Sequence, residues 1–284
     1  MGQYSAVIGA GTMGLGIAYV LAAAGDTAIL VEPDAARGDA ALGELTKVAQ
    51  SAVKRGKLEE TAAKELISRI SVVNAVEALP SEGANLVVEA VPERMDLKKA
   101  LLPAIEKHCA PAILASNTSG LSIDELATVL ERPERFVGLH FFNPVWVMSL
   151  LEIVNGAQTD PAVLEAARAL AIRIGKDPIV VKNMPGFATS RLGVAIGLEG
   201  MRMFEEGVAS AADIDKAMEL GYRHPMGPLR LTDLVGLDVR LDIARNLSKD
   251  LGPRFEPPQI LIDKVAAGEL GKKSGKGFYD WNEA

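Results

Sequence analysis

The sequence places a histidine and a glutamate where they can work together in proton transfer. His140 lies in the apolar run 136–142, which ends at Asn143-Pro144, and Glu152 lies in a second apolar run, 150–154. If the two runs pair as antiparallel strands about the intervening bend, His140 and Glu152 face each other, because each lies six residues from Trp146. A carboxylate opposite an imidazole fixes the ring's tautomer and makes histidine a competent general base. For the segment taken alone, a structural ion pair is the commoner explanation.

Whole-chain properties limit the class of protein that carries this pair. The 284 residues suffice for two domains, and 49% hydrophobic with 24% charged residues is typical of a globular protein. The net charge of −7 argues against nucleic acid or an anionic membrane surface as a partner. No apolar run reaches the length of a membrane span, and the strand-like start leaves no room for a signal peptide.

Cys109 is the only cysteine of the chain. An internal disulfide is therefore impossible, and we expect a buried, unreactive thiol in a protein of the reducing cytoplasm. The spacing of the histidine, cysteine and carboxylate residues matches no metal site, so no metal is expected.

Strand-like and helical runs alternate before residue 183. The strand-like runs are 5–8, 27–31, 85–88, 112–115, 136–142, 150–154 and 179–181, and the helical runs are 13–24, 34–50, 97–108, 123–130 and 162–175. This alternation predicts an α/β, Rossmann-type doubly wound parallel sheet, with the strands of His140 and Glu152 as an antiparallel element at its edge. Beyond it only helices joined by Gly/Pro turns are expected. We therefore predict an N-terminal domain at 1–184 and an all-α C-terminal domain at 185–284.

A glycine-rich segment follows the first strand-like run. Gly9-Ala10-Gly11-Thr12-Met13-Gly14 satisfies G-x-G-x-x-G between a strand and a helix, the context of a dinucleotide site. Gly9 makes the tight turn, Gly11 admits the pyrophosphate, and Gly14 lets helix and strand pack closely. The helix beginning near Thr12 and Met13 offers free N–H donors to the phosphates.

An acidic residue ends the second strand-like run, where the adenosine ribose of a dinucleotide lies. Glu32 closes Ile29-Leu30-Val31-Glu32, and its charge would repel a 2′-phosphate, so NAD is expected rather than NADP. Arg37 nearby is interpreted as a solvated helix residue.

With a dinucleotide site and a His/Glu pair, the whole chain resembles the L-3-hydroxyacyl-CoA dehydrogenase family, and is similar to the bacterial 3-hydroxybutyryl-CoA dehydrogenases. The resemblance runs from end to end and rests on motifs in the same order. They are Ile8-Gly9-Ala10-Gly11-Thr12-Met13-Gly14, Val88-Glu89-Ala90, Ala115-Ser116-Asn117-Thr118-Ser119, Leu139-His140-Phe141-Phe142-Asn143-Pro144, Pro185-Gly186-Phe187, His224-Pro225-Met226-Gly227-Pro228, Val235-Gly236-Leu237-Asp238 and Lys272-Lys273-Ser274-Gly275-Lys276-Gly277-Phe278-Tyr279.

The resemblance implies roles for three catalytic residues. His140 would take the proton of the 3-hydroxyl, Glu152 would orient the imidazole and balance its charge, and Ser119 would hydrogen-bond the substrate oxygen. Ser119 can also cap the helix that follows, a role compatible with catalysis.

The same resemblance implies four further cofactor contacts. Asn143 and Asn117 belong to the nicotinamide side, and Glu93 with Lys98 would touch the nicotinamide ribose. A solvated helix face is the alternative for Glu93 and Lys98.

The basic run Lys54, Arg55 and Lys57 matches a lysine-rich segment that binds coenzyme A phosphates in the family. Solvated surface is an equal alternative for so short a run. Trp146, in the bend between the two strands, is interpreted as a wall of the acyl or pantetheine channel, and a hydrophobic cover of the hairpin is the alternative.

Four positions depart from the family pattern around the substrate, one of them Ser149, where many relatives have lysine. Ser190 stands where the family has a substrate-contacting asparagine, and keeps a donor and an acceptor on a shorter side chain. Gly120 replaces a second serine, and Trp146 replaces a small residue or proline.

The expected function is NAD-dependent oxidation of a short-chain (S)-3-hydroxyacyl-CoA, and the reverse reduction, in fatty acid metabolism. One alternative keeps the chemistry on a hydroxy acid that is free or bound to acyl carrier protein. Another is an NAD-binding, non-catalytic, crystallin-like relative. The family also implies a homodimer formed through the C-terminal domain, where Leu192, Ile196, Leu198 and Met201 exceed what one helical layer needs to bury.

Overall fold

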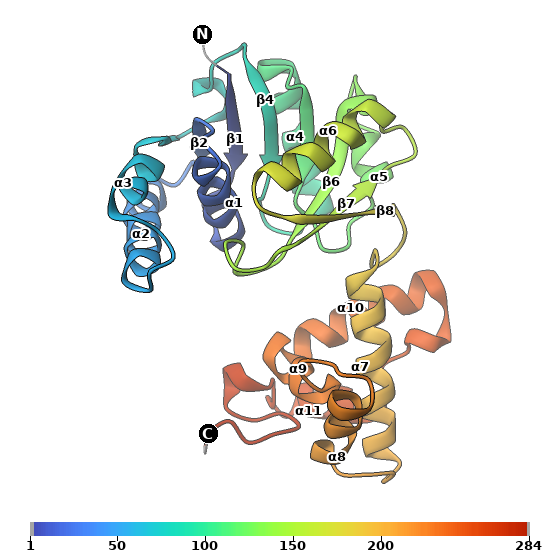
Figure 1. The fold of residues 1–284 in the computed structure, drawn as a ribbon. Helices are drawn as coiled ribbons and strands as arrows, with labels where there is room; N and C mark the ends of the chain where they lie inside the picture. Colours follow the sequence, from blue (N-terminus) through green and yellow to red (C-terminus); the bar gives the residue numbers. More distant parts are fainter. Residues whose placement is uncertain (1–2, 283–284) are drawn as a thin grey trace. The chain divides into compact units, whose positions relative to one another are not determined.

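The computed structural model describes residues 3–282, and the chain divides between Met184 and Pro185 into two compact units. The first unit is an eight-stranded sheet of order β3-β2-β1-β4-β5-β6-β7-β8, flanked by helices (Figure 1). The strands are β1 (Tyr4–Ile8), β2 (Ala28–Val31), β3 (Ile70–Val73), β4 (Ala84–Glu89), β5 (Ile113–Ser116), β6 (Phe136–Phe141), β7 (Leu150–Asn155) and β8 (Asp177–Lys182).

All neighbouring strands run parallel except β6 and β7, which form an antiparallel pair. The order reverses between β1 and β4, and the crevice at the carboxyl ends of such strands is where doubly wound sheets bind their ligands. The predicted Rossmann-type sheet is confirmed.

Three helices of the first unit begin after an N-cap residue whose side chain bonds to the first helical turn. Asp34, Ser122 and Asp160 each accept a hydrogen bond from a main-chain N–H of the first helical turn, which stabilises the helix end. The helices are α1 (Thr12–Ala23), α2 (Ala35–Lys54), α3 (Glu60–Ser68), α4 (Met95–Cys109), α5 (Ile123–Ala127) and α6 (Pro161–Arg173), with 3-10 turns η1 (Val76–Ala78) and η2 (Pro133–Arg135).

One continuous core joins the sheet to α1, α2, α3 and α6, and it includes Val145 of the bend between β6 and β7. Every residue of β1 and β2 is buried, as expected for parallel strands covered on both faces. The rigid sheet therefore fixes the strand ends, where the candidate chemistry lies.

Two features of the sheet differ from the sequence prediction. The strand β3, with the helix α3 before it, was not predicted, because Ile70–Val73 is only four residues long. The antiparallel pair does not form the edge of the sheet: β8 pairs parallel to β7 and is the edge strand.

The second unit is helical. Its elements are α7 (Thr189–Glu205), α8 (Ala211–Lys216), the π-helical turn η3 (Ala217–Gly221), α9 (Pro228–Val235), α10 (Leu237–Leu251), α11 (Gln259–Ala266), and the 3-10 turns η4 (Pro253–Phe255) and η5 (Lys272–Ser274). Its core includes Leu198 and Met201, so the expectation that these two residues belong to a surplus apolar face was wrong. Leu192 and Ile196 are exposed.

A buried aspartate fastens the last residues of the second unit to α9. The carboxylate of Asp233 accepts hydrogen bonds from the main-chain N–H groups of Phe278 and Tyr279 and from the indole of Trp281, each at 2.9 Å. No helix in residues 3–282 has both the length and the apolar character needed to cross a membrane.

Candidate active site

His140 and Glu152 face each other across the antiparallel pair of β6 and β7, so the predicted register is confirmed. The Nδ1 atom of His140 donates to Oε2 of Glu152 at 2.6 Å, and both side chains are almost fully buried. The ring of Phe142 lies against the imidazole, with 4.4 Å between the ring centroids. A buried carboxylate at this distance fixes the tautomer and favours the imidazolium when it forms.

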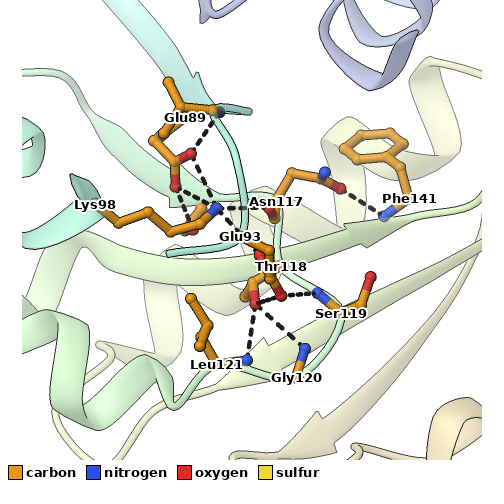
Figure 2. A network of polar contacts seen from close by, with 11 residues as sticks. Glu89, Glu93, Lys98, Asn117, Thr118, Ser119, Gly120, Leu121 and Phe141 are labelled. Carbon is orange, nitrogen blue, oxygen red and sulfur yellow. Dashed lines mark hydrogen bonds and ion pairs between the residues drawn. The ribbon is translucent and has the colours of Figure 1, made fainter. Parts of the chain in front are cut away.

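Asn117 links the end of β5 to the strand that carries the histidine. Its side-chain oxygen accepts a hydrogen bond from the main-chain N–H of Phe141, the residue after His140, at 3.1 Å. Its own N–H donates to the main-chain oxygen of Glu89 at 2.7 Å. Asn117 thereby holds three neighbouring strand ends together (Figure 2).

The segment after Asn117 is organised by Glu93 and Thr118. The Glu93 carboxylate accepts from the Thr118 hydroxyl at 2.6 Å and from the Ser119 N–H at 2.8 Å. The Thr118 hydroxyl in turn accepts from the N–H groups of Gly120 and Leu121 (Figure 2). Ser119 does not cap the next helix, because Ser122 is the residue whose side chain does so.

A buried ion pair lies beneath this segment. The ammonium of Lys98 contacts both carboxylate oxygens of Glu89, at 2.9 and 2.8 Å, and donates to the Asn117 main-chain oxygen at 2.9 Å. Glu89 also accepts from Ser116 and from the Val91 N–H. Burial raises the pKa of Glu89, while Lys98 opposes that rise. The solvated-face interpretation of Lys98 was therefore wrong.

Glu89 was not singled out from the sequence, although a signal existed. It is the one charged residue in the run Asn85–Ala90, and a charge at the end of a buried strand needs a partner. Glu93 is partly exposed and lies 3.5 Å from the Lys98 ammonium, so it continues the same network toward solvent.

The glycine-rich loop leaves space for a ligand at one position only. A Cβ on Gly14 would lie 1.8 Å from the Gly9 carbonyl oxygen, and Gly9 itself adopts φ of +105° beside Ala90. A Cβ on Gly11 would meet no atom within 4 Å. Gly11 stands at the N-terminus of α1, with exposed Thr12 and half-buried Met13 next to it. Open space together with the N–H groups of the first helical turn, which have no partner within the helix, fits a pyrophosphate.

Glu32 lies at the end of β2 beside this loop. One carboxylate oxygen accepts from the Ala10 N–H and the other from the Asp34 N–H, each at 3.0 Å. Arg37 is largely exposed, as expected for a solvated residue, and its guanidinium lies 3.7 Å from a Glu32 carboxylate oxygen. Glu32 therefore also fixes the glycine-rich loop, a role that the sequence did not reveal.

Trp146 lies near α1, and the basic run lies at the end of α2. The Trp146 ring lies against Tyr19 of α1, with 5.8 Å between centroids. Lys54, Arg55 and Lys57 are all exposed at the end of α2. Asn143, at the start of the bend, is exposed as well. Ser190 occupies the first turn of α7 in the second unit, and a Cβ on Gly120 would meet open space.

Comparison with known proteins agrees with these observations. Residues 5–184 match the 3-hydroxyacyl-CoA dehydrogenase, NAD binding domain, and residues 186–281 match the 3-hydroxyacyl-CoA dehydrogenase, C-terminal domain. The chain is 41% identical over 279 residues to a probable 3-hydroxybutyryl-CoA dehydrogenase of Bacillus subtilis, with 98% of this chain and 96% of the relative covered.

Two further relatives show the same extent of similarity. A 3-hydroxybutyryl-CoA dehydrogenase of Clostridioides difficile is 38% identical, with 98% of this chain and 99% of that protein covered. The crystal structure of an (S)-3-hydroxybutyryl-CoA dehydrogenase of Ralstonia eutropha superposes with a TM-score of 0.93 at 37% identity, covering 99% of each chain. The chain belongs to the 3-hydroxyacyl-CoA dehydrogenase family and its first unit is an NAD-binding domain.

Proposed function

We propose that this protein oxidises a short-chain (S)-3-hydroxyacyl-CoA to the 3-oxoacyl-CoA with NAD, and catalyses the reverse reduction. The observation that carries the proposal is the buried His140–Glu152 pair in the sheet that also bears the glycine-rich loop. The preference for a short acyl chain rests on the relatives named 3-hydroxybutyryl-CoA dehydrogenase.

The residues present fit NAD. Gly9, Gly11 and Gly14, with Thr12 and Met13, would hold the pyrophosphate, since the loop is open only at Gly11. Glu32 would hold the adenosine ribose. The cofactor residues proposed for the nicotinamide and its ribose are Glu93, Lys98, Asn117 and Asn143. When bound, NAD supplies a hydride acceptor at C4 of its nicotinamide.

The chain's own residues supply the proton chemistry. His140 would take the 3-hydroxyl proton at Nε2, because Nδ1 donates to Glu152. Glu152 would stabilise the resulting imidazolium, which returns the proton to the substrate oxygen in the reverse direction. Ser119 would donate a hydrogen bond to that oxygen. The hydrogen bond from the Ser119 main-chain N–H to Glu93 supports this role, because it fixes the backbone that carries the hydroxyl.

The remaining substrate contacts belong to the carrier and the acyl chain. Lys54, Arg55 and Lys57 would bind coenzyme A phosphates, and their exposure in an acidic protein supports this role. Trp146 would line the channel beside them. Ser190 would reach the substrate from α7 in place of an amide.

One comparison of substrates tests the proposal against its alternatives. NADH oxidation is followed with acetoacetyl-CoA, with acetoacetate and with acetoacetyl-acyl carrier protein at equal concentrations. Turnover of the CoA thioester well above the other two is expected. Preference for the free acid or the carrier protein would replace the CoA substrate, and NADH binding without any turnover would overturn the enzymatic function.

We also propose a homodimer formed through residues 185–284, with residues 1–184 as the cofactor domain. The support is a set of exposed apolar side chains on α7, α9 and α10, namely Leu192, Ile196, Leu231, Leu234, Val235 and Val239. Light scattering of the purified protein tests this. A monomeric mass at micromolar concentration would exclude the dimer.

The single, buried Cys109 supports the cytoplasm as the proposed compartment.

A further inference from the structure

We propose that Lys176 is a positioning residue for the dehydrogenase reaction. Its ammonium holds the bend of residues 142–149 between β6 and β7, here called the catalytic bend, and thereby fixes Asn143 and Trp146 relative to the His140–Glu152 pair. The proposal rests on the proposed function for the roles of Asn143 and Trp146, and on the contacts of Lys176 for everything else.

Lys176 is a buried cation that is satisfied by main-chain oxygens. Its side chain ends inside the first unit, where Nζ donates to the carbonyl oxygens of Val145 and Met148, the latter at 2.8 Å. Within residues 3–282 no carboxylate forms an ion pair with it. Burying an ammonium without a counter-ion costs free energy. Its two hydrogen bonds to the bend therefore indicate a structural role that an apolar residue could not fill.

The main chain of Lys176 and of the residues on either side of it is held in place by a turn and hydrogen bonds. Gly175 has φ of +74° and closes α6, and the Lys176 N–H donates to the Ala171 oxygen at 2.8 Å. The next residue, Asp177, begins β8 and donates to the Ser149 oxygen at 2.7 Å. The backbone of Lys176 is thus held on both sides, so its side chain extends from a fixed position.

The opposite side of the catalytic bend packs on α1. Val145 is buried against Gly16, where an added Cβ would lie 2.7 Å from the Val145 side chain. Trp146 lies against Tyr19 one turn further along the helix. Because α1 begins at the glycine-rich loop, the bend is clamped between Lys176 and the helix that the loop starts.

The bend is also the connection that sets the register of β6 and β7. His140 faces Glu152 only in the observed register, and a slip of one residue would turn one of these side chains to the other face of the sheet. Asn143 and Trp146 lie in the bend itself. Loss of the Lys176 hydrogen bonds is therefore expected to disturb catalytic geometry and not stability alone.

Trp146 gives a direct signal for the position of the bend, because Trp281 is the only other tryptophan. In a Trp281→Phe background, we expect Lys176→Met to make Trp146 more accessible to acrylamide. We also expect kcat/KM for acetoacetyl-CoA to fall about tenfold, as for the loss of one or two charged hydrogen bonds. Lys64→Met, which changes an exposed lysine on α3, is the matched control.

Two further variants separate positioning from stability. Lys176→Arg keeps a cationic donor and should recover part of the turnover and of the Trp146 shielding. Gly16→Ala presses on Val145 from α1 with Lys176 intact, so it should reproduce both effects even if Lys176→Met does not fold. Rates are normalised to the folded fraction measured by circular dichroism.

The proposal is overturned if Lys176→Met lowers only the melting temperature while normalised kcat/KM and Trp146 quenching equal those of Lys64→Met. It is also overturned if Lys176→Arg behaves as Lys176→Met does. Should the parent protein turn over no thioester, the proposed function fails, and the quenching measurements still decide whether Lys176 holds the bend.

Discussion

The Nδ1 atom of His140 lies 2.6 Å from Oε2 of Glu152, on facing positions of the only antiparallel strand pair among the eight strands. Neither strand lies at the edge of the sheet, because β8 pairs with the outer side of β7. The Glu152 side chain is fully buried, so its charge acts on the imidazole in surroundings of low polarity. This geometry predicts that the charge of Glu152 matters as much as its shape.

Replacing Glu152 by glutamine tests that charge. The amide keeps an oxygen that can accept from Nδ1 but no longer stabilises the imidazolium, so kcat for acetoacetyl-CoA should fall about a hundredfold or more. NADH binding, followed by fluorescence titration, should stay unchanged.

His140→Gln is the companion variant, and it should remove turnover while NADH still binds. Loss of NADH affinity in either variant would indicate a structural pair. So would normal turnover in Glu152→Gln.

The glycine-rich loop offers a matched pair of substitutions. Gly14→Ala forces a Cβ to 1.8 Å from the Gly9 oxygen, so the loop cannot keep its shape, and both the melting temperature and NADH binding should fall. Gly11→Ala meets no protein atom, so the melting temperature should be that of the parent.

The Cβ of Gly11→Ala nevertheless occupies the space assigned to the pyrophosphate. Its Kd for NADH, measured by fluorescence titration, should therefore rise about tenfold or more through steric exclusion. Equal NADH affinity in Gly11→Ala and the parent would mean that the cofactor does not approach the backbone here.

The sequence predicted these two features because each rests on local rules. A glycine pattern between a strand and a helix determines its own geometry, and the alternation of side chains along two strands determines which residues meet across a short bend. Neither inference needs knowledge of distant residues. Both were therefore accessible before the fold was known.

Contacts that depend on how a helix or a loop packs onto the sheet were not accessible in this way. The Glu89–Lys98 pair joins a strand end to a helix, and the ammonium of Lys176 reaches a bend 28 to 31 residues earlier in the chain. Sequence spacing cannot reveal which carbonyl a lysine will meet. The edge strand β3 also escaped prediction: it has only four residues, Ile70–Val73, and its place beside β2 depends on the fold.

Glu32 has two separable roles that substitutions can divide. Glu32→Gln keeps an acceptor for the Ala10 N–H but loses the charge, so the Kd of NADH should rise about tenfold, and the preference for NADH over NADPH should narrow. Glu32→Ala should also lower the melting temperature, because a buried N–H loses its acceptor.

Arg37→Ala removes an exposed neighbour and is the control for both Glu32 variants. Fluorescence titration with each dinucleotide measures the effect. An NADPH affinity that does not change relative to NADH in Glu32→Gln would remove Glu32 from the ribose site.

Cys109 closes α4 with its thiol buried, and burial raises its pKa. The preceding residue, His108, forms a hydrogen bond between its ring Nε2 and the Leu79 main-chain oxygen, at 2.8 Å. The folded protein should therefore resist a disulfide-exchange reagent at pH 8, while the urea-unfolded chain reacts at once.

The raised pKa of Cys109 also has a consequence for stability. Above the unfolded thiol's pKa, about 8.5, the unfolded chain loses its proton before the folded protein does. It then binds fewer protons, so stability falls as pH rises, by at most about 1.4 kcal/mol per pH unit. Urea unfolding at pH 7.5 and 9.5 should show this extra loss in the parent and not in Cys109→Ala. Equal losses in both proteins would mean that the thiol titrates normally in the folded state.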